Sequence, residues 1–429
     1  MSSIPITYHA EWWVPAKADP NNRVFMTLPE GMEQRYTGNL SYDKELGTTL
    51  ELYIVPSRLR ATHYYHNDVV WGSDANGNKF TLFNVEIIKW NKGDFSKTEF
   101  SVGLVLIGDN ILSIDDTRFN QCVVRYPYLK KWAFDDRLNR DVLSDNISFS
   151  LTDKDRDRNL IFSSVGDNIE WKLNYTFDVY WNDFDATIMQ DTYLLIKAPD
   201  STSIQNYLQH TLEFTQFLSI ALFCEQSPTE MTLINKENRR KTKVLFTIRK
   251  SQDPRGSRLI KYDELIEKLP AMLKKWHQQY ERVSPIVGYL IKSLDNKRTF
   301  DVPDFLIIAQ ALDGYHKRFV NKKDGKDIRQ YEHQIAVLLK KFKSVKAVRD
   351  CHIDPEILKD SRHKYSHLYP DEEPTKAVNA DELYWLTEKC KVLLSCCILN
   401  MMGLTNKEIN LCFKDSPISG IINLLPPEL

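Results

Sequence analysis

The sequence lacks the patterns that would mark a disulfide-linked or strongly charged protein. Its seven cysteines are an odd number and form no C-x-x-C pair, which argues against a disulfide framework and favours reduced thiols, as in a cytoplasm. The formal net charge is -1, so no overall field attracts nucleic acid or a membrane surface. Any contact with nucleic acid must therefore come from local patches.

Long apolar runs and targeting segments are also missing. The longest apolar run, Val392 to Leu404, is interrupted by Ser395 and Asn400. It is shorter than the roughly 20 residues that a membrane-spanning helix needs. The N-terminus shows no basic region followed by an apolar one, so no signal peptide is expected. These absences predict a cytoplasmic location and no membrane partner.

The first part of the chain, residues 1–200, reads as β-rich. The clearest strand, Ile169 to Val179, alternates strictly between apolar and polar residues, which predicts one buried and one exposed face. We expect an N-terminal β-rich, sandwich-like domain, with an open barrel as the alternative. Further strands are expected at Thr49–Val55, Lys79–Ile88, Phe100–Ile107, Cys122–Tyr126, Ile147–Leu151 and Thr187–Ile196.

Residues 201–295 read as a connecting region of mixed helix and strand. A helical stripe begins at Ile204, and two short strands are expected at Met231–Ile234 and Val244–Ile248. The segment Lys236 to Lys261 holds ten Lys or Arg and only two acidic residues. It is either a solvated hairpin or a patch for RNA or another anionic partner, in which Arg239, Arg240 and Lys241 are the candidate contacts.

The last part, residues 296–429, has helical periodicity throughout. Asp354-Pro355 gives one helix a polar N-cap and a proline at its first position, and Pro370 marks its stop. The chain is therefore expected to be a multidomain α+β protein that ends in an α-helical bundle. From residue 263 onward, helices are expected at Asp263–Arg282, Pro285–Ser293, Asp304–Asn321, Lys326–Phe342, Asp354–Leu368 and Asp381–Met402.

The stretch Asp360 to His367 carries the chemistry of the bundle. Arg362 can grip a phosphate through a planar fork of donors, and His363 and His367 can move protons near neutral pH. On an ideal helix Arg362 and His367 lie about 140° apart, so a shared site needs a distorted helix end or a second chain. His363 and His367 have zinc-compatible spacing, but Lys364 replaces the expected glutamate and no third ligand is nearby, so no metal is expected.

This stretch resembles the R-x4-6-H motif of HEPN domains, with His363 directly after the arginine. The upstream segment Phe305 to His316 resembles an early HEPN helix of the form F-x-x-x-x-Q-A-L-E-x-x-H. Asp313 stands where the family usually has glutamate, one methylene longer. The resemblance predicts a HEPN bundle around these two helices.

The N-terminal part resembles the N-terminal domain of ApeA-type anti-phage proteins. The resemblance rests on several short strings that follow one another in the family's order. It covers most of the chain, with residues 200–300 the least similar. The strings are Trp12-Trp13-Val14-Pro15, Gly38 to Asp43, Leu50-Glu51-Leu52, Trp71-Gly72, Gly77 to Leu82 and Tyr128 to Trp132.

The two resemblances imply an anti-phage ribonuclease that needs no cofactor. In HEPN ribonucleases the ribose 2′-hydroxyl attacks the adjacent phosphorus, with His367 here as general base or acid and Arg362 holding the phosphate. Asp313 and His363 would support the site, and Lys340 and Lys341 would steer the RNA. The implied partners are an RNA substrate such as a tRNA, a phage-derived activator acting on the N-terminal sensing domain, and a second HEPN copy in a homodimer.

Two other functions remain open from the sequence. A non-catalytic protein would use the bundle for dimerisation or nucleotide binding, and its N-terminal domain would recognise a phage component or a glycan through Trp12, Trp13 and Trp71. A metallohydrolase would need bound metal. A further cluster, His63 to His66, lies between predicted strands, where we expect no site.

Overall fold

The computed structural model divides the chain into two interleaved units. The first comprises Met1–Pro127, Ser164–Thr211 and Ser227–Lys250, and the second comprises Tyr128–Ser163, Leu212–Gln226 and Ser251–Leu429. The structure describes residues 5–15, 35–53, 66–90, 97–133, 138–143, 146–151, 160–164, 166, 168–181, 186–237, 239–247, 250–254, 258–294, 302–320, 322–323, 326–368 and 376–424. His63, Tyr64 and Tyr65 lie outside these residues.

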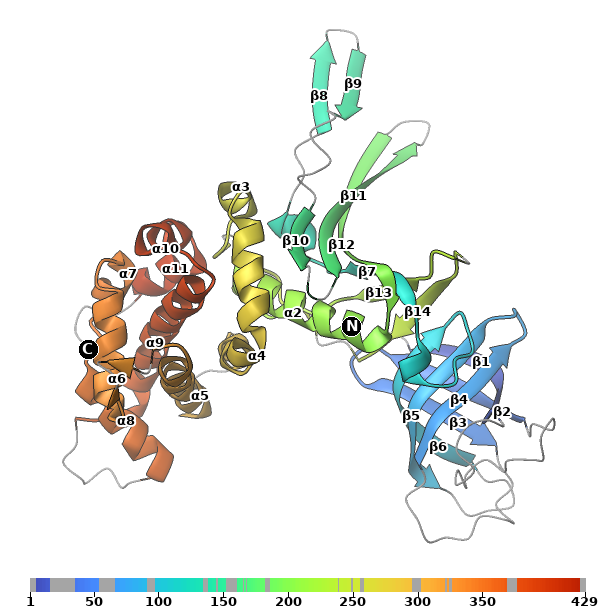
Figure 1. Ribbon diagram of the computed structural model, residues 1–429, viewed down its shortest axis with the longest axis horizontal. Helices are drawn as coiled ribbons and strands as arrows, with labels where there is room; N and C mark the ends of the chain where they lie inside the picture. The colour runs from blue at the N-terminus through green and yellow to red at the C-terminus, as the bar shows by residue number, and fades with distance from the viewer. Residues whose placement is uncertain are drawn as a thin grey trace. The chain divides into compact units, whose positions relative to one another are not determined.

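Six strands of the first unit form a closed antiparallel barrel, coloured blue in Figure 1. Neighbours follow the order β6-β3-β2-β1-β4-β5, and β5 pairs back with β6 to close the ring. Closure leaves none of these strands with an unpaired edge. The strands are β1 (Ile6–Trp13), β2 (Tyr36–Asp43), β3 (Gly47–Tyr53), β4 (His66–Asp74), β5 (Lys79–Trp90) and β6 (Lys97–Ile107).

The barrel interior is filled by alternate residues of each strand, as the period of two requires. Trp12 lies at its centre with no exposed surface, and its indole N–H donates to the Gly38 carbonyl at 3.2 Å. Gly72 leaves the space that this ring occupies, since a Cβ there would lie 2.4 Å from Trp12 Cε3. Trp12 and Trp13 are buried, which removes them as candidates for surface recognition of a glycan.

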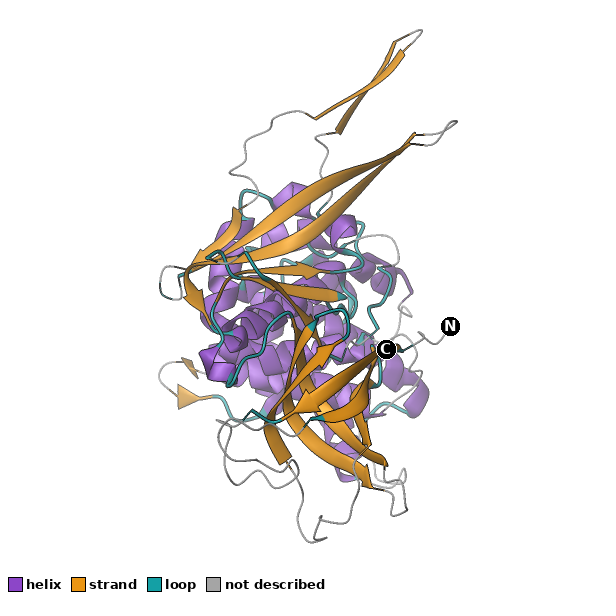
Figure 2. Cartoon of the chain, turned by 90° about the vertical axis from the view of Figure 1, so that its right-hand side faces the viewer, coloured by secondary structure: helices purple, strands orange, loops and turns teal. Residues whose placement is uncertain are grey.

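The sheet of the first unit continues beyond the barrel in the order β11-β12-β7-β13-β14-β6. The long β11–β12 hairpin, in orange in Figure 2, pairs Glu170 with Lys197 and contains the strand predicted from the strict alternation. β13 and β14 fall in the expected connecting region, and β14 joins the barrel strand β6. The bounds are β7 (Phe119–Arg125), β11 (Ile169–Trp181), β12 (Ala186–Thr202), β13 (Glu230–Ile234) and β14 (Lys241–Leu245), with a short 3-10 helix η1 (Ile114–Asp116).

The α+β class expected from the sequence is confirmed. The β-rich part differs from the expected sandwich-like form, because its sheet closes into a barrel instead of splitting into two packed layers. Alternation fixes which residues face inward but not which strands pair, so it is compatible with both forms. Closure depends on the register of β5 against β6, where Phe80 pairs with Ile107.

The second unit is mostly helical, from yellow to red in Figure 1. The boundary between the units runs through helix α2 (Ile204–Leu222) and strand β10 (Leu160–Ser164). Helix α5 packs against α4, α8 and α9. The helices are α1 (Leu129–Trp132), α3 (Tyr262–Leu265), α4 (Leu269–Ser293), α5 (Val302–Tyr315), α6 (Tyr331–Lys341), α7 (Lys346–Asp350), α8 (Pro355–His367), α9 (Ala380–Met401), α10 (Asn406–Phe413) and α11 (Pro417–Leu424), with hairpins β8 (Leu138–Leu143)–β9 (Asn146–Leu151) and β15 (Lys322–Lys323)–β16 (Lys326–Asp327).

Two helical predictions were wrong in detail. The expected break before Pro285 is absent, and α4 continues through this proline, because buried Val283, Ile286 and Val287 pack the helix on both sides of it. Packing of this kind outweighs the lost backbone hydrogen bond. The helix expected from Lys326 begins only at Tyr331, after the β15–β16 hairpin. Helix α5 is followed by a π-helical turn, η3 (His316–Val320).

All seven cysteines are buried, and none forms a disulfide. Burial raises the pKa of the Cys351 thiol to about 12 and that of Cys224 to about 11. The thiolate is the reactive form of cysteine, so both burial and protonation suppress reaction. These thiols therefore act as core side chains.

We expect the native protein to resist thiol alkylation almost completely. Iodoacetamide at pH 8 should modify no cysteine during a short reaction, whereas all seven should react in guanidinium chloride. Intact-mass spectrometry before and after denaturation measures this directly. Rapid native modification of any one cysteine would contradict its burial.

Across the described residues, the structure contains no helix that combines the length and the apolar character needed to span a membrane.

Candidate active site

Helix α8 begins and ends with clear capping interactions. The Asp354 carboxylate accepts the Glu356 backbone N–H at 2.8 Å, and Pro355 occupies the first turn. The helix ends at His367, because Leu368 adopts a left-handed conformation (φ 55°, ψ 42°) while its N–H donates to the Lys364 carbonyl. The predicted N-cap is confirmed, and His367 occupies the last helical position.

The Arg362 side chain is held by an aromatic ring and a carboxylate. Its guanidinium carbon lies 4.5 Å from the centre of the Tyr331 ring, a cation–π arrangement. Its Nη2 lies 3.6 Å from Asp313 Oδ2. Tyr331 is itself fixed, since its hydroxyl donates to the Ala309 carbonyl at 3.1 Å, and burial raises its pKa well above the usual value. Asp313 of α5 and Tyr331 of α6 therefore orient the Arg362 guanidinium.

Asp313 is shared between two cations. Its Oδ2 also accepts from Lys317 Nζ at 2.9 Å, a shorter contact than the one with Arg362. One carboxylate between two cations leaves a net positive charge, so Arg362 retains attraction for an anion. The Asp313 side chain is only 12% exposed, against 35% for Arg362. The geometry therefore places Asp313 beside Arg362.

The two histidines of the motif lie next to each other at the surface. Their ring centres are 4.7 Å apart, with the planes edge-to-face, and both residues are exposed. Arg362, His363 and His367 line one cavity of about 370 Å³, called the α8 cavity below. His367 ends the helix, and Arg362 and His367 both reach this cavity from a single chain. The 140° offset is thus compatible with a common cavity.

Three further residues line this cavity, and only Asp360 belongs to the stretch singled out in the sequence: Tyr331, Lys359 and Asp360. Lys359 Nζ lies 3.3 Å from Asp360 Oδ1, while Asp360 Oδ2 accepts the Lys376 backbone N–H at 3.2 Å. Lys359 and Asp360 stand just before Arg362 in the same helix, so helical spacing alone indicated their closeness. Tyr331 comes from α6, and in the sequence it is one member of an apolar helical stripe: Ile328, Tyr331, Ile335, Leu338, Leu339 and Phe342.

Tyr365 and Ser361 hold α8 in place. The Tyr365 hydroxyl donates to the Val378 carbonyl at 3.0 Å, and its ring packs edge-on against Phe305. Buried Ser361 accepts the Val378 N–H at 3.1 Å. These contacts give Tyr365 a packing role. Both contacts fix the face of α8 opposite the exposed histidines.

The candidate RNA contacts fall in different units. Arg239, Arg240 and Lys241 belong to the first unit, where Arg240 Nη1 is paired with Asp109 Oδ2 at 2.9 Å. Lys340 and Lys341 end α6 in the second unit, and both are exposed. Neither lines the α8 cavity.

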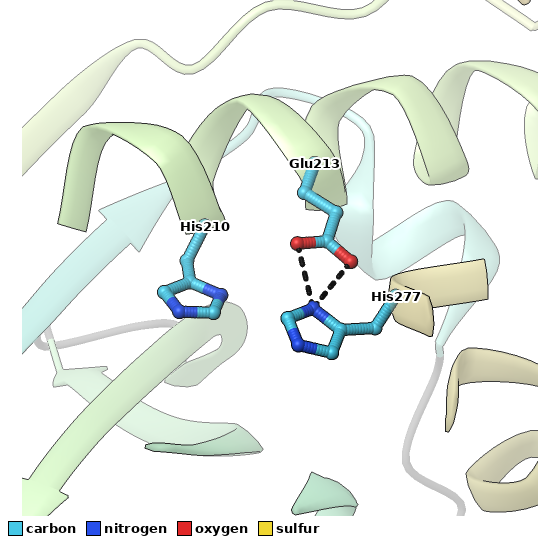
Figure 3. Close-up of side chains that lie close together, drawn as sticks. All are labelled: His210, Glu213 and His277. Atoms are coloured by element: carbon cyan, nitrogen blue, oxygen red, sulfur yellow. Dashed lines mark hydrogen bonds and ion pairs between the residues drawn. The ribbon is translucent and has the colours of Figure 1, made fainter. Parts of the chain in front are cut away.

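A separate cluster lies on α2 and α4 (Figure 3). Both carboxylate oxygens of the buried Glu213 contact His277 Nδ1, at 3.0 and 3.1 Å. His210 lies three residues before Glu213, on the same face of α2, and packs edge-on against Trp171. No spacing pattern indicated the Glu213–His277 pair beforehand, because 64 residues separate the two. Among the described residues, no group of three candidate metal ligands includes His363 or His367.

His316 completes the segment from Phe305 that suggested a HEPN helix. It has no exposed surface, and neither ring nitrogen has a hydrogen-bond partner in the described structure. Burial lowers its pKa, and the nearby Asp313 only partly opposes this. A neutral His316 therefore packs behind Asp313 as part of the core, on the π-helical turn.

Comparison with known families identifies both parts of the chain. Residues 7–276 match the model described as ApeA N-terminal domain 1. Residues 306–408 match the model described as Apea-like HEPN, which spans α5 to α9 and includes the whole α8 cavity. No curated protein matches the chain. No solved structure matches it either.

Proposed function

Because the chain belongs to the ApeA family, with an ApeA N-terminal domain followed by an Apea-like HEPN domain, we propose that it is a metal-independent endoribonuclease of anti-phage defence. The HEPN match supports an anti-phage nuclease effector. The observation that carries the finer proposal is the shared cavity of Arg362, His363 and His367. It joins a phosphate-binding group to two proton-transfer groups.

The proposed reaction needs no metal ion or cofactor. His367, acting as general base, takes the proton of a ribose 2′-hydroxyl, and the 2′-oxygen attacks the adjacent phosphorus. The bond from phosphorus to the 5′-oxygen breaks, and the leaving oxygen takes up a proton from water or from His363. The products are a 2′,3′-cyclic phosphate and a 5′-hydroxyl.

Arg362 is proposed to bind the scissile phosphate. Charge grows on the non-bridging oxygens as the 2′-oxygen attacks, and a preorganised guanidinium stabilises that charge more than the ground state. The contacts with Tyr331 and Asp313 support this role, because they orient the guanidinium before substrate arrives. Lys359 lines the same cavity beside its partner Asp360, so Arg362 supplies the unbalanced positive charge there.

The N-terminal domain is proposed to regulate this nuclease in response to a phage-derived activator. The order of the two family domains in one chain supports such a division of labour. A homodimer through the HEPN domain would place two α8 cavities together. The substrate we expect is a structured RNA such as a tRNA.

The proposal predicts that cleavage depends on the 2′-hydroxyl and not on metal. Activated protein should cleave RNA in excess EDTA, and a single 2′-O-methyl group at the cut position should abolish that cut. Mass spectrometry of the products should show a 2′,3′-cyclic phosphate. The matched control carries the 2′-O-methyl group one nucleotide downstream of the cut, where cleavage should persist. Cleavage of the blocked RNA, or of all-DNA substrate, would exclude the mechanism.

A further inference from the structure

The helical unit contains a second cavity, of about 430 Å³, which shares no lining residue with the α8 cavity. Four of its lining side chains are cationic: Lys275 and Arg282 of α4, Arg318 of η3 and Lys341 of α6. None of the described residues that line it is acidic. We refer to it below as the α4–η3 cavity.

The two arginines of this cavity are fixed by contacts with each other's backbone. Arg282 Nη2 donates to the Arg318 carbonyl, and Arg318 Nη1 donates to the Arg282 carbonyl. The Arg282 guanidinium also lies 4.7 Å from the Phe319 ring centre. These contacts hold two guanidinium groups side by side while leaving several N–H donors unused.

The distorted backbone around the cavity helps to place these groups. Pro285 lacks the N–H that would bond the Glu281 carbonyl, so the helical hydrogen bonding of α4 is interrupted next to Arg282. Arg318 belongs to a π-helical turn, a feature that is rare and often found at functional sites. Lys275 lies against Gly403, where a Cβ would come within 2.6 Å of its Nζ.

Among the described residues, no acidic side chain pairs with the cations of this cavity. Across the described residues, no carboxylate lies within ion-pair distance of Lys275, Arg282, Arg318 or Lys341. Arg362 and Arg240, by contrast, each face an aspartate. Four like charges around one cavity repel one another, and a bound anion relieves that repulsion. The cavity is therefore suited to an anionic ligand.

The aromatic rings of the cavity argue against a nucleobase as its ligand and favour a phosphate group. Phe319 stacks on Tyr315 with ring centres 5.0 Å apart, and Arg282 covers it as well. Tyr315 is 1% exposed, so neither ring offers a free face for a nucleobase. We propose that the α4–η3 cavity binds backbone phosphates of the RNA away from the cut, an inference that rests on the proposed ribonuclease function.

Helix α6 relates the two cavities to each other. Its first residue, Tyr331, lines the α8 cavity, and its last, Lys341, lines the α4–η3 cavity. Ten residues of α-helix rise about 15 Å. That span suits a strand of a few nucleotides, within the roughly 4–16 nucleotides that protein grooves for single strands cover. One RNA strand can therefore occupy both cavities.

The test measures RNA binding by a cleavage-deficient His367→Ala full-length protein in EDTA, using fluorescence anisotropy and a 20-nucleotide RNA. Adding Lys275→Gln and Lys341→Gln removes two cavity charges from exposed side chains. We expect affinity to fall about tenfold, and the slope of log K against log salt to lessen by about 1.4. The matched control, Lys274→Gln with Lys343→Gln, removes two exposed lysines outside the cavity and should change affinity less than twofold.

The outcomes separate this inference from the ribonuclease proposal. If the cavity variant and the control lost RNA affinity equally, the cavity would not be an RNA site, whether or not the wild type cleaves RNA. If pyrophosphate instead competed with the labelled RNA as strongly as unlabelled RNA does, and that competition disappeared in the cavity variant, the cavity would be a site for small anions. The Arg282→Gln, Arg318→Gln variant should show the same loss, provided that its circular dichroism and melting temperature match those of the wild type. If the wild type bound RNA through the cavity but did not cleave it, the cavity would stand as an RNA site and the nuclease proposal would be refuted.

Discussion

Replacing His367 with alanine is expected to lower the rate of RNA cleavage by about 10²–10⁴-fold, the usual contribution of a general acid or base. His367 ends α8 and is exposed, so its side chain can be removed without a cavity forming in the core. RNA affinity should change little, because the cations of the site remain. Single-turnover cleavage in EDTA, followed across pH, should lose the limb of the profile that reports the base.

Two histidine controls sharpen this result. His333→Ala removes an exposed histidine of α6 that does not line the α8 cavity, and it should cleave at the wild-type rate. His363→Ala removes the neighbouring ring, 4.7 Å away, and should have a smaller effect than His367→Ala. A larger loss in His363→Ala would exchange the roles of the two histidines. Full activity in His367→Ala would refute its assignment.

The parts of this site that the sequence predicted are local in the chain. The N-cap of α8 and the closeness of Arg362 to His363 follow from spacing within one helix. The Arg362–Tyr331 contact spans 31 positions and depends on how α6 packs against α8. Nothing in the spacing of Tyr331 distinguished it from the other apolar residues of its stripe.

The same limit applied to the fold. Period-two alternation identified β11 because it depends on neighbouring residues only. Barrel closure depends on the pairing of β5 with β6 and β3 with β6, which alternation cannot rank against a sandwich. The helix break expected before Pro285 was wrong for a related reason. Proline locally disfavours a helix, but tertiary packing of α4 opposes this preference.

Replacing Arg362 with alanine is expected to lower the cleavage rate by about 10²–10³-fold, the usual cost of removing one charge-stabilising group at a reacting centre. Arg362→Lys should recover only part of the rate, because an ammonium cannot reproduce the planar fork or its packing on Tyr331. The pH profile should keep the shape of the wild type, which separates this residue from His367. Single-turnover kinetics on the same RNA measures both quantities.

The control for charge alone is Arg349→Ala, which removes an exposed arginine of α7 outside the α8 cavity and should leave the rate unchanged. Asp313→Asn tests the positioning of the guanidinium. It removes the carboxylate charge beside Arg362 and Lys317 while keeping the size of the side chain. If Asp313 acts by holding Arg362 in place, the Asn variant should be slower than wild type, and adding Asp313→Asn to Arg362→Ala should slow that variant little further. If Asp313 acted independently of Arg362, the two losses would multiply. A wild-type rate in Arg362→Ala would remove the phosphate-binding role on which the candidate site depends.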